Sequence, residues 1–150
     1  MVVVENWRAS HAHVIKTFQA NLRRRTRNTN FLVGQRLKRR ITIEDKLRRQ
    51  PEMNLARMHD IAGCRVIFPT LVELLEFRKK FNSSRSKHRR ITKERDQFNY
   101  IERPKSTGYR GIHDVYKYDS FAPSAKQWNG LSIEVQYRTC LLYTSDAADE

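Results

Sequence analysis

The segment Leu131-Ser132-Ile133-Glu134-Val135-Gln136-Tyr137-Arg138 alternates between apolar and polar side chains along its whole length. This period of two predicts a β-strand, because successive side chains of a strand point to opposite faces of a sheet. The apolar face would carry Leu131, Ile133, Val135 and Tyr137. The polar face would carry Ser132, Glu134, Gln136 and Arg138. We therefore expect a sheet with helices packed against it, in which this strand has one all-polar face and the candidate site residues meet at one edge of the sheet.

Further strands and helices are predicted before this segment. Extended or β-rich stretches are predicted at Phe31–Arg40, Ile61–Phe68 and Phe98–Ile101, followed by a strand that ends at about Tyr118. Helices are predicted at Asn6–Arg27, from a capped start at Thr42-Ile43-Glu44-Asp45 to Pro51, in a short turn at Asn54–Met58, and through Leu71, Leu74, Leu75, Phe77 and Phe81. Asn82–Asp96 is expected to be a solvated basic loop or helix, and Asp119–Gly130 a loop. The fold class is therefore α+β, with a mixed sheet of about four to five strands flanked by helices.

The composition favours a polyanionic partner. Lys and Arg outnumber Asp and Glu by 30 to 16, which gives a formal net charge of +14 and a pI near 10.3. Cys64 and Cys140 show neither metal-ligand spacing nor a disulfide pattern, so a reducing cytoplasm is the expected location. No apolar run has the length of a membrane span, and the apolar start at 1–4 is too short for a signal peptide. We expect a cytoplasmic protein without a membrane partner.

The last ten residues, Leu141–Glu150, differ from the rest of the chain. They carry three acids and no base, whereas all 30 basic residues precede them. The string is similar to translated sequencing-adapter read-through, and we exclude it from fold reasoning. The expected organisation is one domain over 1–140, which would continue past Thr139 in the natural protein, followed by a foreign tail over 141–150.

Two sets of charged residues have the chemistry of a nucleotide site. Arg36 and Lys38 share one face of an extended segment and Lys46 follows on a helix, so the three could surround a triphosphate. Asp60 and Glu134 supply carboxylates of the kind that hold a hard metal ion and accept a proton during phosphoryl-type transfer. Taken singly, the cations also fit a solvent-facing basic strand, and the polar face around Glu134 also fits simple solvation.

A third set lies in the stretch Arg103–His113. If this stretch is extended after its turn, Tyr109, Gly111 and His113 share a face, with Lys105 close by. A flat ring, a gap and an imidazole beside cations suit a nucleotide platform. A loop that runs into an amphipathic strand is the alternative. The sequence has no P-loop, no G-x-G-x-x-G and no H-E-x-x-H motif.

Together the three sets resemble the synthetase domain of the RelA/SpoT family of alarmone synthetases, in order from about Gly34 to Thr139. The matching pieces are Arg36-x-Lys38 with Lys46, the Asp60–Ile67 segment DIAGCRVI, the segment from Tyr100 to His113, and the Glu134–Thr139 segment EVQYRT. The resemblance implies a nucleotidyltransferase-like synthetase fold and a Mg²⁺-dependent transfer of pyrophosphate from ATP to the 3′-hydroxyl of GTP or GDP. Asn99 and Thr107 depart from the residues common in the family, and both departures bear on the acceptor.

The resemblance also implies a role for each residue. Arg36, Lys38 and Lys46 would bind ATP, and Asp60 and Glu134 would be the catalytic and metal-binding carboxylates. Lys105, Tyr109, His113, Gln136 and Arg138 would bind the acceptor nucleotide. A helix normally follows the glutamate strand in this family. We expect its replacement by the unusual tail to leave a core face open and to make this fragment fold poorly or lack activity.

Two other interpretations stay open. In the first, the chain is a toxin-type relative that pyrophosphorylates the 3′ end of tRNA or adenosine nucleotides, with the basic run Arg85–Arg95 on the RNA backbone. In the second, the chain is a non-catalytic basic module that binds RNA. The acceptor and the oligomeric state are not fixed by the sequence.

Overall fold

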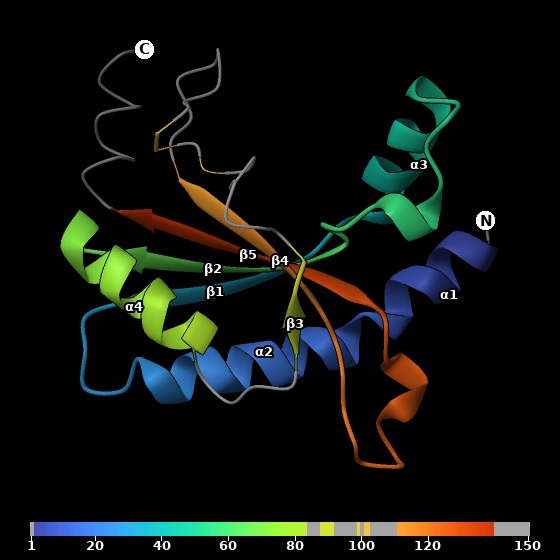
Figure 1. Cartoon of the computed structure of the whole chain (residues 1–150). Helices are drawn as coiled ribbons and strands as arrows, with labels where there is room; N and C mark the ends of the chain where they lie inside the picture. The colour runs from blue at the N-terminus through green and yellow to red at the C-terminus, as the bar shows by residue number, and fades with distance from the viewer. Residues whose placement is uncertain (1, 84–87, 92–98, 100, 103–110, 140–150) are drawn as a thin grey trace.

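A mixed five-stranded sheet forms the centre of the computed structural model, which describes residues 2–83, 88–91, 99, 101–102 and 111–139. The strands are β1 (Leu32–Leu37), β2 (Ala62–Phe68), β3 (Arg89–Arg90), β4 (Ile112–Lys117) and β5 (Ser132–Thr139), in the order β1-β2-β5-β4-β3 (Figure 1). β2 and β5 are parallel, and every other neighbouring pair is antiparallel. The predicted α+β class with a mixed sheet is therefore confirmed.

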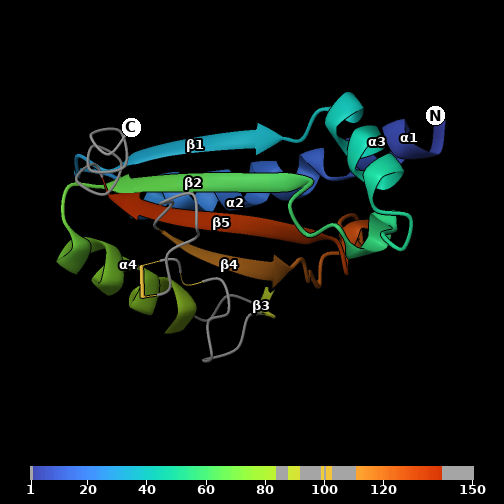
Figure 2. The same cartoon turned by 90° about the horizontal axis from the view of Figure 1, so that it is seen from above.

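Helices cover one face of this sheet and one of its ends. The helical elements are α1 (Val2–Ser10), α2 (Ala12–Arg25), α3 (Arg40–Arg49), the 3₁₀ turn Leu55–Arg57, α4 (Leu71–Ser83) and the 3₁₀ turn Lys126–Trp128. α2 and α4 lie on the same face of the sheet, whereas α1 and α3 contact each other beyond its end (Figures 1 and 2). Among the described residues, no helix is long and apolar enough to cross a membrane.

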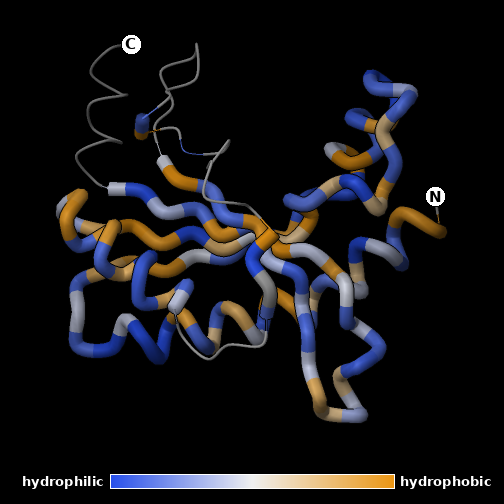
Figure 3. The backbone as a smooth tube through the Cα atoms, in the orientation of Figure 1, coloured by the Kyte–Doolittle hydropathy of each residue, from blue (hydrophilic) through white to orange (hydrophobic). Residues whose placement is uncertain are grey.

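The core fills the space between the sheet and its helix-covered face. Ile133, Val135 and Tyr137 of β5 are fully buried, and Phe18 and Leu22 of α2 belong to the same apolar cluster. The alternation in β5 therefore orients the strand as the sequence predicts. Figure 3 shows hydrophobic residues in the strands, in α4 and at the start of α1, whereas the end of α2 and the loop after it are mostly hydrophilic.

The predicted single helix over Asn6–Arg27 is wrong, because the chain forms two helices that meet at His11. The backbone N–H of His11 bonds to the carbonyl of Arg8, three residues back, which tightens the turn. The buried His11 ring lies edge-on to Trp7, and its Nδ1 donates to the Trp7 carbonyl at 2.6 Å. In a continuous α-helix the Trp7 carbonyl would accept the backbone N–H of His11. Here it accepts the imidazole of His11 instead.

Other element boundaries also differ from the prediction. α3 begins at Arg40, two residues before the predicted cap Thr42. The backbone is extended at Arg39, which is the N-cap residue although its side chain makes no capping bond. A short strand, β3, lies inside the segment predicted as loop or helix. Leu71 and Leu75, predicted to pack on the sheet, are 41% and 46% exposed.

Several predictions fall wholly or partly outside the described residues. They concern the stretch 103–110 with Lys105 and Tyr109, most of the basic run 85–95, Cys140 and the tail 141–150. At Asn99 the structure shows an isolated bridge to Ile112, in the region where the strand Phe98–Ile101 was expected.

A buried carboxylate joins three elements on the helix-covered face. Asp114 of β4 is fully buried and accepts two hydrogen bonds from the guanidinium of Arg78 on α4, at 2.8 and 3.0 Å. Asn82 donates to the same carboxylate at 3.3 Å, and Arg90 of β3 lies 3.8 Å away. Because a buried charge is tolerated only with such partners, this cluster ties α4 and β3 to β4.

We predict that Asp114→Asn lowers the free energy of unfolding by about 3 kcal/mol, because it leaves the guanidinium of Arg78 largely buried without its counter-charge. Urea denaturation followed by circular dichroism measures the change. The control is Asp45→Asn, which removes an exposed pair with Arg49 and should cost about 0.5 kcal/mol or less. An equal loss of unfolding free energy in the two variants would contradict the assignment of Asp114 as a buried carboxylate that stabilises the contacts of α4 and β3 with β4.

Candidate active site

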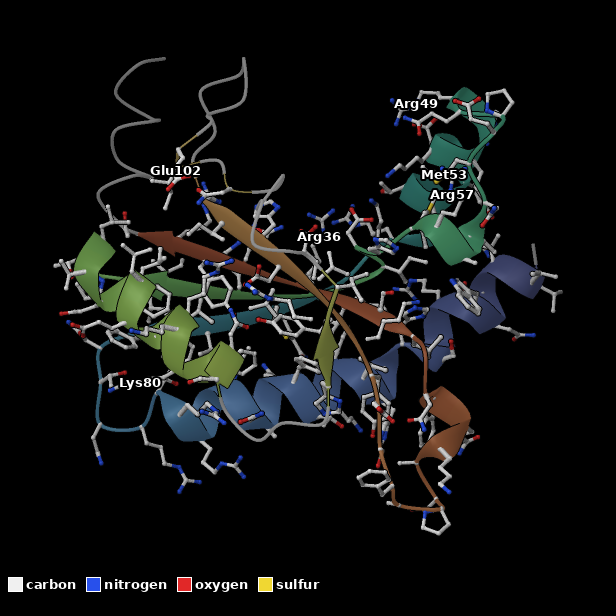
Figure 4. All side chains as sticks on the ribbon, viewed as in Figure 1. Arg36, Arg49, Met53, Arg57, Lys80 and Glu102 are labelled. Atoms are coloured by element: carbon white, nitrogen blue, oxygen red, sulfur yellow. The ribbon has the colours of Figure 1, made fainter. Side chains whose placement is uncertain are left out.

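A cavity of about 420 Å³ opens on the face of the sheet opposite α2 and α4. Its wall includes five residues predicted for the site, namely Arg36, Lys38, Asp60, Glu134 and Gln136. They come from β1, β5 and the turns that flank β1 and β2. Figure 4 shows Arg36 above the sheet, on the side away from α2 and α4. Residues almost 100 positions apart in the sequence thus line one space.

The strand register explains how the cavity stays open. Gly63 of β2 is paired with Arg36 on one side and with Glu134 on the other. A Cβ at Gly63 would come no closer than 3.8 Å to the carbonyl oxygens of those two residues, so the backbone there is uncrowded. The missing side chain leaves a gap between a cation and a carboxylate, and that gap is part of the cavity.

An ion pair lies at one end of the cavity. The Lys38 ammonium donates to Oδ2 of Asp60 at 2.7 Å, with the Lys38 side chain 11% and the Asp60 side chain 38% exposed. The Lys38 backbone is fixed by its N–H bond to the Ile61 carbonyl and by Arg8, which donates to the Lys38 carbonyl. The backbone of Lys38 is therefore held in place next to the residue that follows Asp60.

The same pair controls the protonation of Asp60. Burial acts to raise the pKa of this carboxyl group, but the hydrogen bond from Lys38 and the charges of Lys38 and Lys46 outweigh burial. The pKa of Asp60 is therefore held below its ordinary value. Asp60 is an anion at neutral pH, the form that a metal ion binds.

A second polar group lies on β5 and its neighbours. Gln136 donates from Nε2 to Oε1 of Glu134 at 2.8 Å, and His113 Nδ1 of β4 lies 3.4 Å from the same oxygen. Arg65 of β2 donates to Oε1 of Gln136 at 3.3 Å. This row of contacts orients the Glu134 carboxylate from both neighbouring strands.

Three described residues predicted for the site lie outside the cavity wall, namely Lys46, Arg138 and His113, the last of which contacts Glu134. Lys46 on α3 is not part of the wall, although its charge acts on Asp60. Arg138 follows Gln136 on the same face of β5 and is 9% exposed. Lys105 and Tyr109 belong to the residues that the structure does not describe.

Arg65 lines the cavity and was missed by the sequence interpretation. The signal was present, because Gly63 and Arg65 are the polar-face positions in a strand whose alternate residues are buried. The chemistry of the wall is therefore three cations around Asp60 and Glu134. Among the described residues no group of three His, Cys, Asp or Glu side chains could hold a metal by itself. The two carboxylates fit an oxygen-binding ion such as Mg²⁺ when a ligand supplies further oxygens.

Comparison with protein families gives a match over most of this fold. The model for the "Region found in RelA / SpoT proteins" matches residues 35–146, which include the second half of β1, all the later strands and every cavity-wall residue except Gly34. The chain belongs to the RelA/SpoT family. No curated protein sequence matches it.

Solved structures of small alarmone synthetases and of a GTP pyrophosphokinase family protein share the fold. A small alarmone synthetase 1 from Bacillus subtilis bound to its product pppGpp is 20% identical, with a TM-score of 0.77, over 97% of this chain and 76% of that one. The same synthetase bound to AMPCPP is 16% identical with a TM-score of 0.68, covering 97% and 74%. A GTP pyrophosphokinase family protein from Streptococcus pneumoniae is 20% identical with a TM-score of 0.74, covering 99% and 75%.

We predict that Lys38→Met lowers the free energy of unfolding by about 1 kcal/mol at pH 7, a modest loss because Asp60 is partly exposed. Asp60 has a depressed pKa in the folded chain, so its pairing stabilises the fold above its unfolded pKa. That contribution is lost as the pH falls through the folded pKa. The deficit of the variant should therefore shrink between pH 5 and pH 3, as measured by denaturation at each pH.

Lys38→Arg serves as the control because it keeps the positive charge next to Asp60. It should show a smaller deficit at pH 7 than the methionine variant. A deficit that is the same at pH 7 and pH 3 for Lys38→Met would show that packing, and not the ion pair, is lost.

Proposed function

We propose that this RelA/SpoT-family chain is a pyrophosphotransferase that moves the β,γ-pyrophosphate of ATP to the ribose 3′-oxygen of GDP or GTP. The observation that carries the proposal is the cavity, in which three cations and two oriented carboxylates meet. A reaction of phosphoryl type needs charge neutralisation, in-line positioning and a proton acceptor, and little else from the protein. The relative that binds pppGpp as its product supports a guanosine acceptor.

Arg36, Lys38 and Lys46 would bind the ATP phosphates. Arg36 lies on the cavity wall opposite Glu134 across the gap at Gly63, so a phosphate chain between them would meet a guanidinium on one side. Lys38 reaches the same space beside Asp60, and Lys46 adds a positive potential from α3. Arg65 adds a fourth cation, which the sequence interpretation did not include.

Asp60 and Glu134 would hold Mg²⁺ together with phosphate oxygens of ATP. When bound, the ion neutralises charge on the pyrophosphate that is transferred. Asp60 is suited to this role because its low pKa keeps it ionised. Lys38 would then share its ammonium between Asp60 and a phosphate, which links the metal side of the site to the nucleotide side.

Glu134 would also accept the proton of the attacking hydroxyl. Gln136 and His113 contact its Oε1 and orient the carboxylate at the cavity wall. The 3′-oxygen attacks the β-phosphorus, and the bond between that phosphorus and the α,β-bridging oxygen breaks. AMP leaves with the bond electrons, and the hydroxyl proton goes to Glu134. His113, Gln136 and Arg138, with Lys105 and Tyr109, would bind the acceptor.

The direct test is to incubate the full chain with ATP, Mg²⁺ and either GTP or GDP, and to separate the nucleotides by anion-exchange chromatography. We expect AMP and a 3′-pyrophosphorylated guanosine nucleotide in equal amounts. Glu134→Gln should reduce turnover by about 1,000-fold or more, because it removes both a proton acceptor and a metal ligand. ATP binding, followed by calorimetry, should change much less.

The matched control is Glu44→Gln, a carboxylate on α3 that does not line the cavity and should leave turnover unchanged. A folded wild-type chain that binds ATP but makes no AMP with either acceptor would sink the proposal.

A second candidate changes only the acceptor. The net charge of +14 suits a polyanion larger than a mononucleotide, so tRNA or an adenosine nucleotide could replace GTP. Running the assay in parallel with GDP, GTP, ADP and uncharged tRNA distinguishes the acceptors. A purely RNA-binding role would instead leave RNA binding unchanged in Asp60→Ala and Glu134→Ala, with no nucleotide product in any assay.

A further inference from the structure

A second hollow lies on the helix-covered side of the sheet. It is an open groove of about 550 Å³ between α2 and the loop that follows β4. The helix contributes Thr17, Asn21, Arg24 and Arg25, whose spacing places them along one side of α2. We call this hollow the back groove. It shares no wall residue with the cavity that contains Asp60 and Glu134.

The α2 wall presents two guanidinium groups side by side. Oδ1 of Asn21 accepts hydrogen bonds from Nη2 of Arg24 at 3.2 Å and from Nε of Arg25 at 2.9 Å. The guanidinium of Arg25 also lies 5.4 Å from the centre of the Phe81 ring. In the described part of the chain, neither arginine forms an ion pair with a carboxylate. The two charges are positioned by a neutral amide, which leaves them available to an anion.

The opposite wall is a fixed loop with aromatic side chains. The His88 ring is stacked on Tyr118 at 4.9 Å, and its Nδ1 accepts the backbone N–H of Asp119. Ser120 is held at both its N–H and its carbonyl by the side chain of Asn129. Phe121 follows and is 66% exposed, although it lines the groove. The exposed carboxylate of Asp119 is also in the wall, so two guanidiniums oppose one carboxylate and the groove is net positive.

We propose that the back groove binds a nucleotide unit of a single-stranded nucleic acid, with its phosphate on Arg24 and Arg25 and its base against Phe121. Adjacent cations and an exposed aromatic ring are the two elements by which proteins bind single strands without reading sequence. The exposed side chains of Arg23 and Arg27 continue the positive charge beyond the groove along the end of α2. A chain of phosphates would follow that charge, whereas a free nucleotide would use only the groove itself.

This proposal does not depend on the proposed enzyme activity. The core between β5 and α2 separates the back groove from the cavity, since Val135 and Tyr137 face the helix while Glu134 and Gln136 face the other way. Binding at the back groove should therefore survive the loss of Glu134, and turnover should survive the loss of Arg24.

The test is fluorescence anisotropy with a labelled 12-nucleotide single-stranded RNA, measured on the full chain in EDTA over a range of salt concentrations. For Arg24→Ala we expect binding about 5- to 10-fold weaker at low salt, and a slope of log affinity against log salt that is smaller by about 0.7, because one phosphate contact is lost. For Phe121→Ala we expect about 10-fold weaker binding with an unchanged slope, because a stacking contact carries no charge.

Lys16→Ala is the matched control, since it removes one exposed positive charge from α2 outside the groove. It should change affinity less than 2-fold. Circular dichroism of each variant checks the fold, which these exposed substitutions should leave intact. Competition with ATP in EDTA distinguishes RNA from free nucleotides as the ligand. If ATP displaces the RNA, and if Arg24→Ala weakens the binding of both, the groove binds free nucleotides as well as RNA.

The proposal is overturned if Arg24→Ala and Phe121→Ala bind the RNA as tightly as the unmodified chain. It is also overturned if Arg36→Ala abolishes RNA binding while Arg24→Ala does not, because the RNA would then occupy the catalytic cavity. Neither result would bear on the nucleotide product assay, which is read from AMP formation.

Discussion

The register of β5 between its two neighbours is the constraint on which the rest of the structure depends. β5 pairs with β2 in parallel and with β4 in antiparallel direction, and Glu134 lies between Gly63 and Val115. A shift of one residue in either pairing would turn Glu134 and Gln136 into the core and Val135 into the cavity. The burial of Ile133, Val135 and Tyr137 against the helices prevents that shift. The hydrophobic core thus fixes the position of the polar site on the other face of the same strand.

The parts of the fold that follow from local patterns could be predicted from the sequence. The alternation from Leu131 to Arg138 predicts β5 within one residue at each end, and the β-rich run from Ile61 to Phe68 predicts β2 equally well. The break at His11 could not be predicted in this way, because the apolar spacing of Trp7, Val14 and Phe18 continues across it. The turn there depends on a buried imidazole and one backbone bond, which no periodicity records.

The site was predictable to the extent that its residues share strand faces. Arg36, Asp60 and Glu134 do meet in one cavity, but their distances depend on pairings between strands far apart in the sequence. Two aspartates show what the sequence leaves open. Asp114 is enclosed by Arg78, Asn82 and Arg90 and has a structural role. Asp60 has Lys38 as its close partner and borders open space. An aspartate thus stabilises the fold on one face of the sheet and is a candidate metal ligand on the other. Only the surrounding residues distinguish the two roles.

The parallel pairing of β2 and β5 has a consequence for how the chain folds during its synthesis. β5 occupies the middle of the sheet, yet it is the last of the described strands to leave the ribosome. Before then, β1 and β2 have each other as partners, while β4 has no central strand to join. α2 can pack on β1 and β2 once these are made, but the part of the core that β5 fills is completed only by residues more than 60 positions after β2. Such a nascent chain leaves part of its hydrophobic surface exposed until β5 is made, and it then acquires both the enclosed core and the assembled cavity in one late step.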